Sequence, residues 1–84
     1  MDIHDFIKER KYLIWYVSDY DKLDARAIVE ATLNYGDWDD VQKLIKILGI
    51  KEMSQIFRKY SNQPRSNYDA RTTRYFNMYF NQYA

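Results

Sequence analysis

The sequence predicts an all-α fold: a single small orthogonal bundle of four to five short helices with a helix-turn-helix-like hairpin. Three observations support this prediction. Apolar residues recur at helical spacing along most of the 84-residue chain. Aspartates that are typical helix caps precede several of these stretches. The only two glycines, Gly36 and Gly49, stand where periodic stretches end.

The chain has the length of one domain. We expect residues 1–84 to form a single helical domain, in which an N-terminal segment (residues 1–22) packs on a helical core (residues 23–84). A domain of this size buries roughly 60–65% of the surface that its unfolded chain exposes, so its margin of stability is small. There is no cysteine, which excludes disulfides and thiolate zinc sites.

The N-terminal segment predicts one short helix and one ambiguous stretch. Residues 2–9 place Ile3, Phe6 and Ile7 on one side of a helix. Residues 11–17 are rich in aromatic and β-branched side chains but do not alternate. An extended tail buried on both sides and a continuation of the helix are both compatible with this pattern. A polar loop is expected at residues 18–22.

The next helix is predicted from about Asp24, a good N-cap, to Asn34. Gly36 is expected to end it in the left-handed conformation. The inward stripe of this helix comprises Ala25, Ile28, Val29 and Thr32.

Asp37 is expected to cap a second helix that ends at Gly49. Asp39 and Asp40 fall in its first turn, where the helix dipole favours anions. Its apolar face comprises Trp38, Val41, Leu44, Ile45 and Leu48.

Two more helices are predicted after Gly49. The first spans residues 51–60 and is followed by a loop at 61–65 that contains Pro64. Its inward residues are Met53, Ile56, Phe57 and Tyr60, and its outward residues are Lys51, Ser54, Gln55, Arg58 and Lys59. The last helix is predicted from near Ser66 to about Gln82, with Asp69 as part of a capping box. One broad face carries Tyr68, Thr72, Tyr75, Phe76, Tyr79 and Tyr83, and the other carries Arg71, Arg74, Asn77 and Asn81.

The formal charges are divided unevenly along the chain. Residues 1–40 contain ten acidic and five basic residues (−5), whereas residues 41–84 contain two acidic and eight basic residues (+6). Two interpretations follow: the halves attract each other within the fold, or the second half presents a basic face to nucleic acid or to an acidic protein.

The basic residues of the second half define the candidate site. If nucleic acid is bound, we expect contacts from the third and last helices, and nearby tyrosines are suited to stack on unpaired bases. Gly49 stands where the turn glycine of a DNA-reading helix-turn-helix would, although an ordinary helical hairpin explains the same pattern. The predicted nucleic-acid-binding residues are Lys51, Gln55, Arg58, Lys59, Arg65, Arg71 and Arg74.

No pattern predicts an enzyme, a metal site or a cofactor. His4 is the only histidine and lies near the N-terminus, so we do not expect a Ser–His–Asp triad. Asp19, Asp21 and Glu30 have part of a calcium-loop spacing, but Asp24 replaces the required glycine and Leu23 an oxygen ligand. No stretch is long enough to span a bilayer and no signal-peptide pattern is present, so we expect a cytoplasmic protein without membrane contact.

Several segments together resemble a known family. They are Leu13-Ile14-Trp15, Leu23-Asp24, Asn34-Tyr35-Gly36-Asp37-Trp38, Arg71-Thr72 and Tyr75-Phe76-Asn77-Met78-Tyr79-Phe80. They resemble small bacterial domains of unknown function that are often encoded upstream of nucleotidyltransferase toxins of the abortive-infection type. The resemblance implies an all-α domain with an antitoxin-like or transcription-regulating role.

Two hypotheses follow from the residues and the resemblance. The first is a non-enzymatic antitoxin-like or DNA-binding regulator of a two-gene module, with DNA, a cognate toxin or both as partners. The second is a protein-interaction or dimerisation module without nucleic-acid binding, which associates through exposed tyrosines or through residues 12–17.

Overall fold

Short helices make up most of the chain in the computed structural model, which describes residues 2–15, 17, 22–64 and 66–84. No strand occurs in these ranges, so the predicted all-α class is confirmed. Nor is any helix in them long and apolar enough to cross a membrane. The elements are α1 (Ile3–Lys8), the 3-10 helix η1 (Lys11–Ile14), α2 (Ala25–Tyr35), α3 (Trp38–Leu48), α4 (Ile50–Ser61) and α5 (Ala70–Tyr83).

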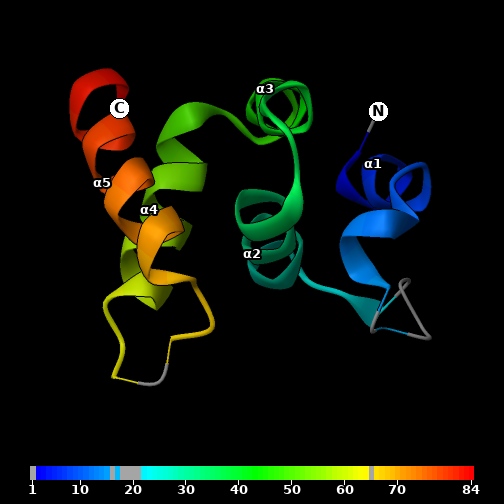
Figure 1. Cartoon of the computed structure of the whole chain (residues 1–84). Helices are drawn as coiled ribbons and strands as arrows, with labels where there is room; N and C mark the ends of the chain where they lie inside the picture. The colour runs from blue at the N-terminus through cyan, green and yellow to red at the C-terminus, as the bar shows by residue number, and fades with distance from the viewer. Residues whose placement is uncertain (1, 16, 18–21, 65) are drawn as a thin grey trace.

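The helices cross one another steeply, as the predicted orthogonal bundle requires. In Figure 1, α3 is seen end-on, whereas α4 and α5 run side by side in opposite directions across the same view. The helix α2 lies in the middle and contacts α1, η1, α3 and α4. The α4–α5 pair therefore forms one side of the molecule, and α1 with η1 forms the opposite side.

An aromatic cluster fixes α5 onto α4. Phe57 of α4 is fully buried, and its ring centroid lies 5.2 Å from Tyr68, 6.2 Å from Phe76 and 5.4 Å from Phe80. Phe76 and Tyr68 belong to the predicted face of the last helix, whereas Phe80 does not. Phe80 is nevertheless fully buried. Aromatic packing of this kind is the main apolar contact between the two helices.

Aspartates cap the helices as the sequence predicts. Asp24 and Asp37 each accept a hydrogen bond from the backbone N–H three residues on. Asp69 also caps, through the backbone N–H of Arg71, and α5 therefore begins at Ala70. The predicted start near Ser66 was wrong, because the aspartate that looked like the second member of a capping box is itself the N-cap.

The two glycines are needed for different reasons. Gly36 has φ −77° and ψ 159°, an extended conformation, so the predicted left-handed cap was wrong. A Cβ there would lie 2.6 Å from the carbonyl oxygen of Thr32, so only glycine allows this close approach. Gly49 has φ 90° and is the single residue between α3 and α4. Its positive φ favours glycine although a Cβ would meet nothing within 4 Å.

The ambiguous stretch after α1 begins as a turn of 3-10 helix. Leu13 and Ile14 are buried, whereas Tyr12 and Trp15 are exposed, so this part is not buried on both sides. The 3-10 turn does not extend α1, because Arg10 between them has φ −127° and ψ 48°, outside the helical region. Residues 16 and 18–21, which include most of the predicted polar loop, lie outside the described residues.

Candidate functional site

The outer face of α4 carries the first group of predicted nucleic-acid contacts. Lys51, Gln55, Arg58 and Lys59 are all exposed, as their helical spacing predicts. Lys51, Gln55 and Arg58 line a shallow hollow of about 190 Å³ together with Ala84 at the end of α5. The structure therefore brings three of the four predicted α4 residues to one surface. Ser54, expected on this outer face, also lines the hollow but is buried.

Arg58 connects this surface to α5. Its Nη2 donates a 3.1 Å hydrogen bond to Oδ1 of Asn81. Lys59 lies near the ring of Tyr60 instead, with Nζ 5.4 Å from the ring centroid. Such an exposed cation–π contact contributes only about 0.5–1 kcal/mol, so Lys59 stays available to a ligand.

Arg71 and Arg74 form a second group near the start of α5, and both are exposed. Helical rise places Arg74 about 10 Å along the axis from Asn81, the residue that binds Arg58. The two groups thus occupy one α4–α5 layer without forming a single cluster. Arg65, also predicted to bind nucleic acid, lies outside the described residues.

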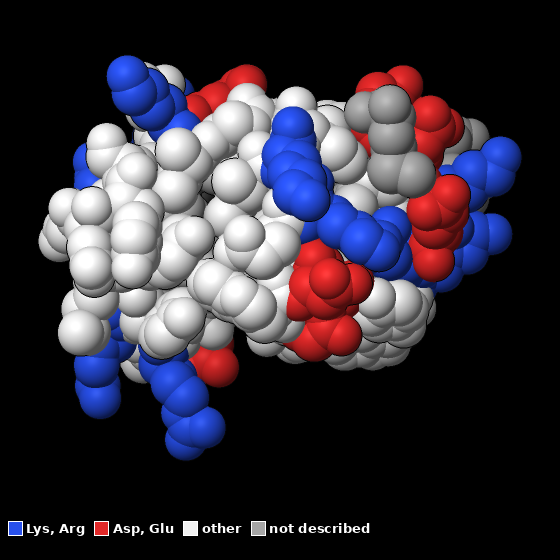
Figure 2. All heavy atoms as spheres, turned by 90° about the horizontal axis from the view of Figure 1, so that it is seen from above, with Lys and Arg blue, Asp and Glu red and all other residues white. Residues whose placement is uncertain are grey.

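These cations are not neutralised by the acidic first half of the chain within the described residues. The ion pairs there join Arg10 to Glu9 and Asp40, Arg26 to Asp24, and Lys43 to Asp39. None involves Lys51, Arg58, Lys59, Arg71 or Arg74. Figure 2 shows Lys and Arg projecting separately from the α4–α5 end, with uncharged surface between them, while most visible acidic side chains lie toward α1.

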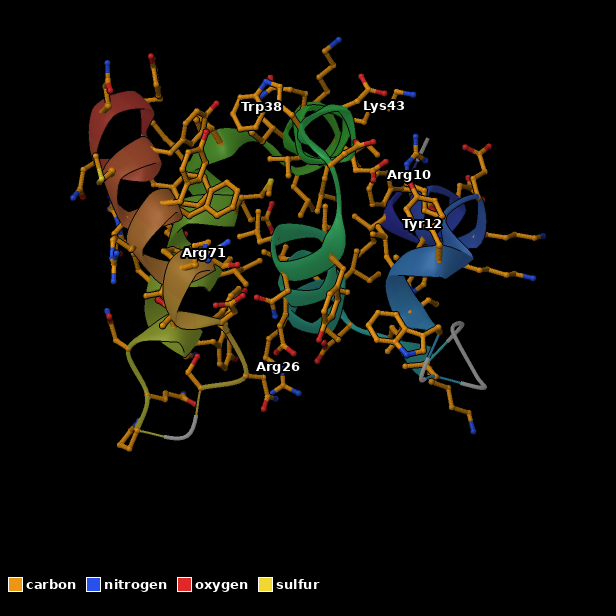
Figure 3. All side chains as sticks on the ribbon, viewed as in Figure 1. Arg10, Tyr12, Arg26, Trp38, Lys43 and Arg71 are labelled. Atoms are coloured by element: carbon orange, nitrogen blue, oxygen red, sulfur yellow. The ribbon has the colours of Figure 1, made fainter. Side chains whose placement is uncertain are left out.

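A groove lined mainly by aromatic residues lies between α3 and α5, next to the second group of cations. We call it the aromatic groove; it has a volume of about 320 Å³ and is lined by Trp38, Tyr75, Met78, Tyr79, Gln82 and Tyr83. Trp38 is 47% exposed, Tyr75 50% and Met78 69%. Figure 3 shows Trp38 on the side of α3 that faces α5.

Rings hold the groove in a defined shape. The rings of Tyr75 and Tyr79 are nearly parallel, with 12° between their planes and 6.4 Å between centroids. Both stand almost perpendicular to Trp38, at 88° and 86°. Gln42 of α3 also reaches α5, with Nε2 3.5 Å from the hydroxyl of Tyr79. The groove is therefore a packed surface whose ring faces remain partly open.

Helical spacing placed Trp38 on the apolar face of its helix and Tyr75 and Tyr83 on the broad aromatic face of the last helix, yet all three side chains are exposed. The number of aromatic residues in α5 was the signal that some of them had to be exposed. A 14-residue helix with aromatic residues at 75, 76, 79, 80 and 83 has more rings than one inward face can bury, and only Phe76 and Phe80 are buried.

A buried network around Asp40 was also missed. Arg10 Nε donates a 2.9 Å hydrogen bond to Asp40, and the Tyr12 hydroxyl donates one of 2.7 Å. The Asp40 carboxylate also completes the capping box with Asp37. Figure 3 shows Arg10 and Tyr12 on the side of the N-terminal segment that faces α3. We assign this network to holding the N-terminal segment in place.

The hydrogen bonds determine the protonation of the network. Burial alone would raise the pKa of Asp40, but the hydrogen bonds from Tyr12, the Asp37 amide and Arg10 together hold it below its usual value. Burial and the hydrogen bond to Asp40 raise the pKa of Tyr12 to about 12. The carboxylate is therefore ionised and the phenol neutral at neutral pH.

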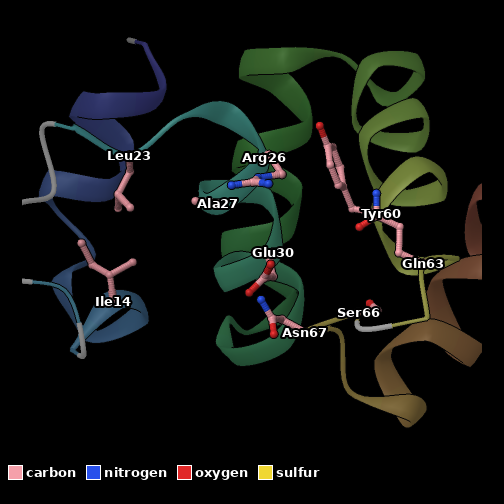
Figure 4. A pocket seen from close by; sticks show the side chains of 9 residues that line it. All are labelled: Ile14, Leu23, Arg26, Ala27, Glu30, Tyr60, Gln63, Ser66 and Asn67. Carbon is pink, nitrogen blue, oxygen red and sulfur yellow. The ribbon is translucent and has the colours of Figure 1, made fainter.

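A polar pocket of about 210 Å³ lies between α2, the end of α4 and the connection to α5 (Figure 4). Burial raises the pKa of Glu30, which lines it, although a hydrogen bond to Asn67 and the charge of Arg26 oppose that effect. The Arg26 guanidinium lies 5.2 Å from the centroid of the Tyr60 ring. The titratable side chains that line this pocket are Arg26, Glu30 and Tyr60.

The remaining titratable groups do not form a reactive cluster in the described ranges. His4 donates from Nε2 to the carbonyl of Leu23, a contact that ties α1 to the start of α2. In the same ranges, no group of three or more His, Asp or Glu side chains is arranged to hold a metal ion. Asp19 and Asp21 of the partial calcium-loop spacing lie outside them. Comparisons with family models, with curated proteins and with solved structures gave no match to this chain.

Proposed function

We propose that this chain is a non-enzymatic nucleic-acid-binding protein, a DNA-binding or antitoxin-like regulator of a two-gene module. The observation that carries the proposal is the exposed set of cations on α4 and α5. These cations are Lys51, Arg58, Lys59, Arg71 and Arg74. None of them forms an ion pair with a carboxylate in the described ranges. Phosphate groups are the natural partners of such cations.

The position of Gln55 adds to this support. It is exposed between Lys51 and Arg58 on one surface, and an amide flanked by cations is suited to contact a base edge while its neighbours contact phosphates. The connection between α3 and α4 argues against the usual docking mode, because a DNA-reading helix-turn-helix has a turn of three or four residues. Here only Gly49 separates the helices. We therefore propose that the outer face of α4 contacts DNA, but not in the docking mode of a helix-turn-helix.

Duplex binding tests the proposal directly. The affinity for a fluorescent 20-base-pair duplex is measured by anisotropy at several salt concentrations, with the double variant Arg58→Ala and Lys59→Ala. We expect binding to weaken steeply with salt, with a slope reduced by about 2 in the variant, since each lost phosphate contact removes about 0.9.

A charge-matched variant provides the control. Lys8→Ala with Lys43→Ala removes the same charge from exposed positions of α1 and α3. It should retain most of the affinity and the full salt slope. Equal losses in the two double variants would show that only net charge matters, and duplex affinity that does not respond to salt would overturn the proposal.

The antitoxin-like form of the proposal has its own test. The resemblance given above supports it, and the measurement is rescue of growth when this chain is coexpressed with a nucleotidyltransferase encoded beside it. No rescue by a well-expressed chain would remove this form while leaving DNA binding to be judged by the duplex experiment.

A second candidate function is self-association, and a specific observation favours it. Trp15 is 65% exposed and lies edge-on to Tyr35, with 4.6 Å between centroids, on the side of the molecule away from α5. Exposed tryptophan and tyrosine side chains are common at protein interfaces. Sedimentation equilibrium should show a dimer that Trp15→Ala disrupts. A monomer at all concentrations would exclude this candidate.

A further inference from the structure

The two arginines of α5 lie near part of the aromatic groove, although the sequence pattern assigned them to the side of the helix opposite Tyr75, Tyr79 and Tyr83. Arg71 precedes Tyr75 by four residues and Arg74 precedes Met78 by four, so each arginine lies one turn from a groove residue on the same side. Both arginines are exposed. A row of cations thus runs beside a row of partly open rings.

The groove itself has no carboxylate in its lining. The nearest acidic residues in sequence are Asp37 and Asp39, on either side of Trp38. Asp37 accepts the capping hydrogen bond of α3, and Asp39 lies 3.5 Å from Nζ of Lys43. The charges of Asp37 and Asp39 are therefore partly satisfied, and on α5 Arg71 and Arg74 each lie one helical turn before a residue of the groove.

Open ring faces beside cations match the chemistry of single-stranded nucleic acid. Unpaired bases stack on aromatic side chains whatever their identity, and neighbouring cations contact the phosphates between them. In a duplex the base faces are covered by the neighbouring base pairs, so they cannot stack on the rings of the groove. An apolar protein partner would use the rings but leave Arg71 and Arg74 without a role.

We propose that the aromatic groove binds a single-stranded segment of nucleic acid, with bases stacked on Trp38 and Tyr75 and phosphates held by Arg71 and Arg74. This rests on the proposed nucleic-acid-binding function and specifies the form of the ligand. It also gives separate tasks to the two groups of cations: those of α4 contact duplex, and those of α5 contact unpaired strand.

The two tryptophans allow a direct test. Replacing Trp15 with Phe leaves Trp38 as the only indole in the chain, and a base stacked on an indole quenches its fluorescence. The probes are a 12-nucleotide oligothymidylate, an oligouridylate of the same length and a 12-base-pair duplex, each titrated at low salt. We expect saturable quenching of Trp38 by either single strand, and little by the duplex.

Matched variants identify the residues responsible. Tyr75→Ala should weaken single-strand binding about ten-fold or more, because it removes one stacking platform. Tyr35→Ala should have no effect, since that residue has nearly the same exposure (53% against 50%) but lies outside the groove. Arg71→Ala with Arg74→Ala should lower the salt slope by about 1.4, or about 0.7 per contact. Circular dichroism checks that each variant folds.

The outcomes separate this proposal from the duplex proposal. Equal affinities for the Tyr75 and Tyr35 variants, or single-strand binding without quenching, would overturn the groove assignment. Duplex binding that depends on Arg58 and Lys59, without any response of Trp38 to single strands, would overturn it while the proposed function stands. Failure of every oligonucleotide to bind overturns both. Trp38 emission that changes with protein concentration alone would instead assign the groove to a second copy.

Discussion

The guanidinium of Arg10 lies 2.9 Å from the carboxylate of Asp40, thirty residues away, and the two side chains are only 10% and 5% exposed. Tyr12 donates to the same carboxylate. These contacts join the N-terminal segment to α3, so a pair of charges that are distant in sequence holds Arg10 and Tyr12 against that helix. A buried charge left without its partner is costly, which gives this contact a measurable consequence.

Asp40→Asn should destabilise the fold strongly. It leaves the buried Arg10 charge with only the 3.5 Å contact to the exposed carboxylate of Glu9. Breaking a buried ion pair in this way typically costs about 3–5 kcal/mol. Urea unfolding followed by circular dichroism measures the loss. The control is Asp39→Asn, one residue earlier in the same turn, whose exposed pair with Lys43 is worth about 0.3–0.5 kcal/mol. Similar losses in the two variants would contradict the assignment.

Stability should decrease in acid partly because of Asp40. Its pKa in the folded chain lies below the usual 3.8, so the unfolded chain takes up a proton at higher pH than the folded one. The contribution of Asp40 is therefore complete above about pH 5, and it is lost as pH falls through 3.8 and then through the folded-state pKa. Urea midpoints measured across this range should fall less steeply in Asp40→Asn than in the unmodified chain. Parallel curves would argue against the network.

Gly49→Ala should destabilise the chain by about 1–3 kcal/mol, the usual cost of a strained backbone conformation. Space is not the cause, because a Cβ at Gly49 meets nothing within 4 Å. The loss arises from φ 90° alone. A chain synthesised with D-alanine at this position should lose less, since D residues favour positive φ. Equal losses for L- and D-alanine would point to a steric cause instead.

Phe57→Ala should cost about 3–5 kcal/mol, because it leaves a cavity among Tyr68, Phe76 and Phe80. Met78→Ala, at an exposed position of α5, should stay within about 0.5 kcal/mol. Chemical denaturation measures both. A small effect at Phe57 would mean that α5 is not anchored through this ring.

Local patterns predicted most helices because capping and periodicity act over a few residues. Asp24 and Asp37 cap where expected, and Met53 and Phe57 are buried as their spacing requires. Ser54 is buried as well, although helical spacing alone marks it as outward.

Some errors arise because contacts between distant residues leave no local signal. The helix dipole favours Asp40 in the first turn of α3, as predicted, but no sequence pattern indicated its contact with Arg10, thirty residues away. The error at Gly36 is local instead: its backbone is extended, and glycine is required by the close approach to the Thr32 carbonyl four residues earlier.

The candidate site was only partly predictable. The outward cations of α4 follow from spacing, and the described ones are exposed as expected. The aromatic groove does not follow from spacing, because α5 has rings on several sides and periodicity does not decide which of them α4 covers. Trp38 shows the same limit: it lies at a position with apolar spacing, but the adjacent helix leaves almost half of it in solvent.

The one-residue connection at Gly49 also determines where this chain tolerates changes of length. An added residue there turns the whole of α4 by about 100°. Glu52 would then take the place of Met53, and Lys59 would take the place of Tyr60. The connection between Ser61 and Ala70 is longer, and its residues 62–64 are exposed, so an extra residue there need not rotate either helix. Insertions and deletions in related chains should therefore accumulate between α4 and α5 and be absent between α3 and α4.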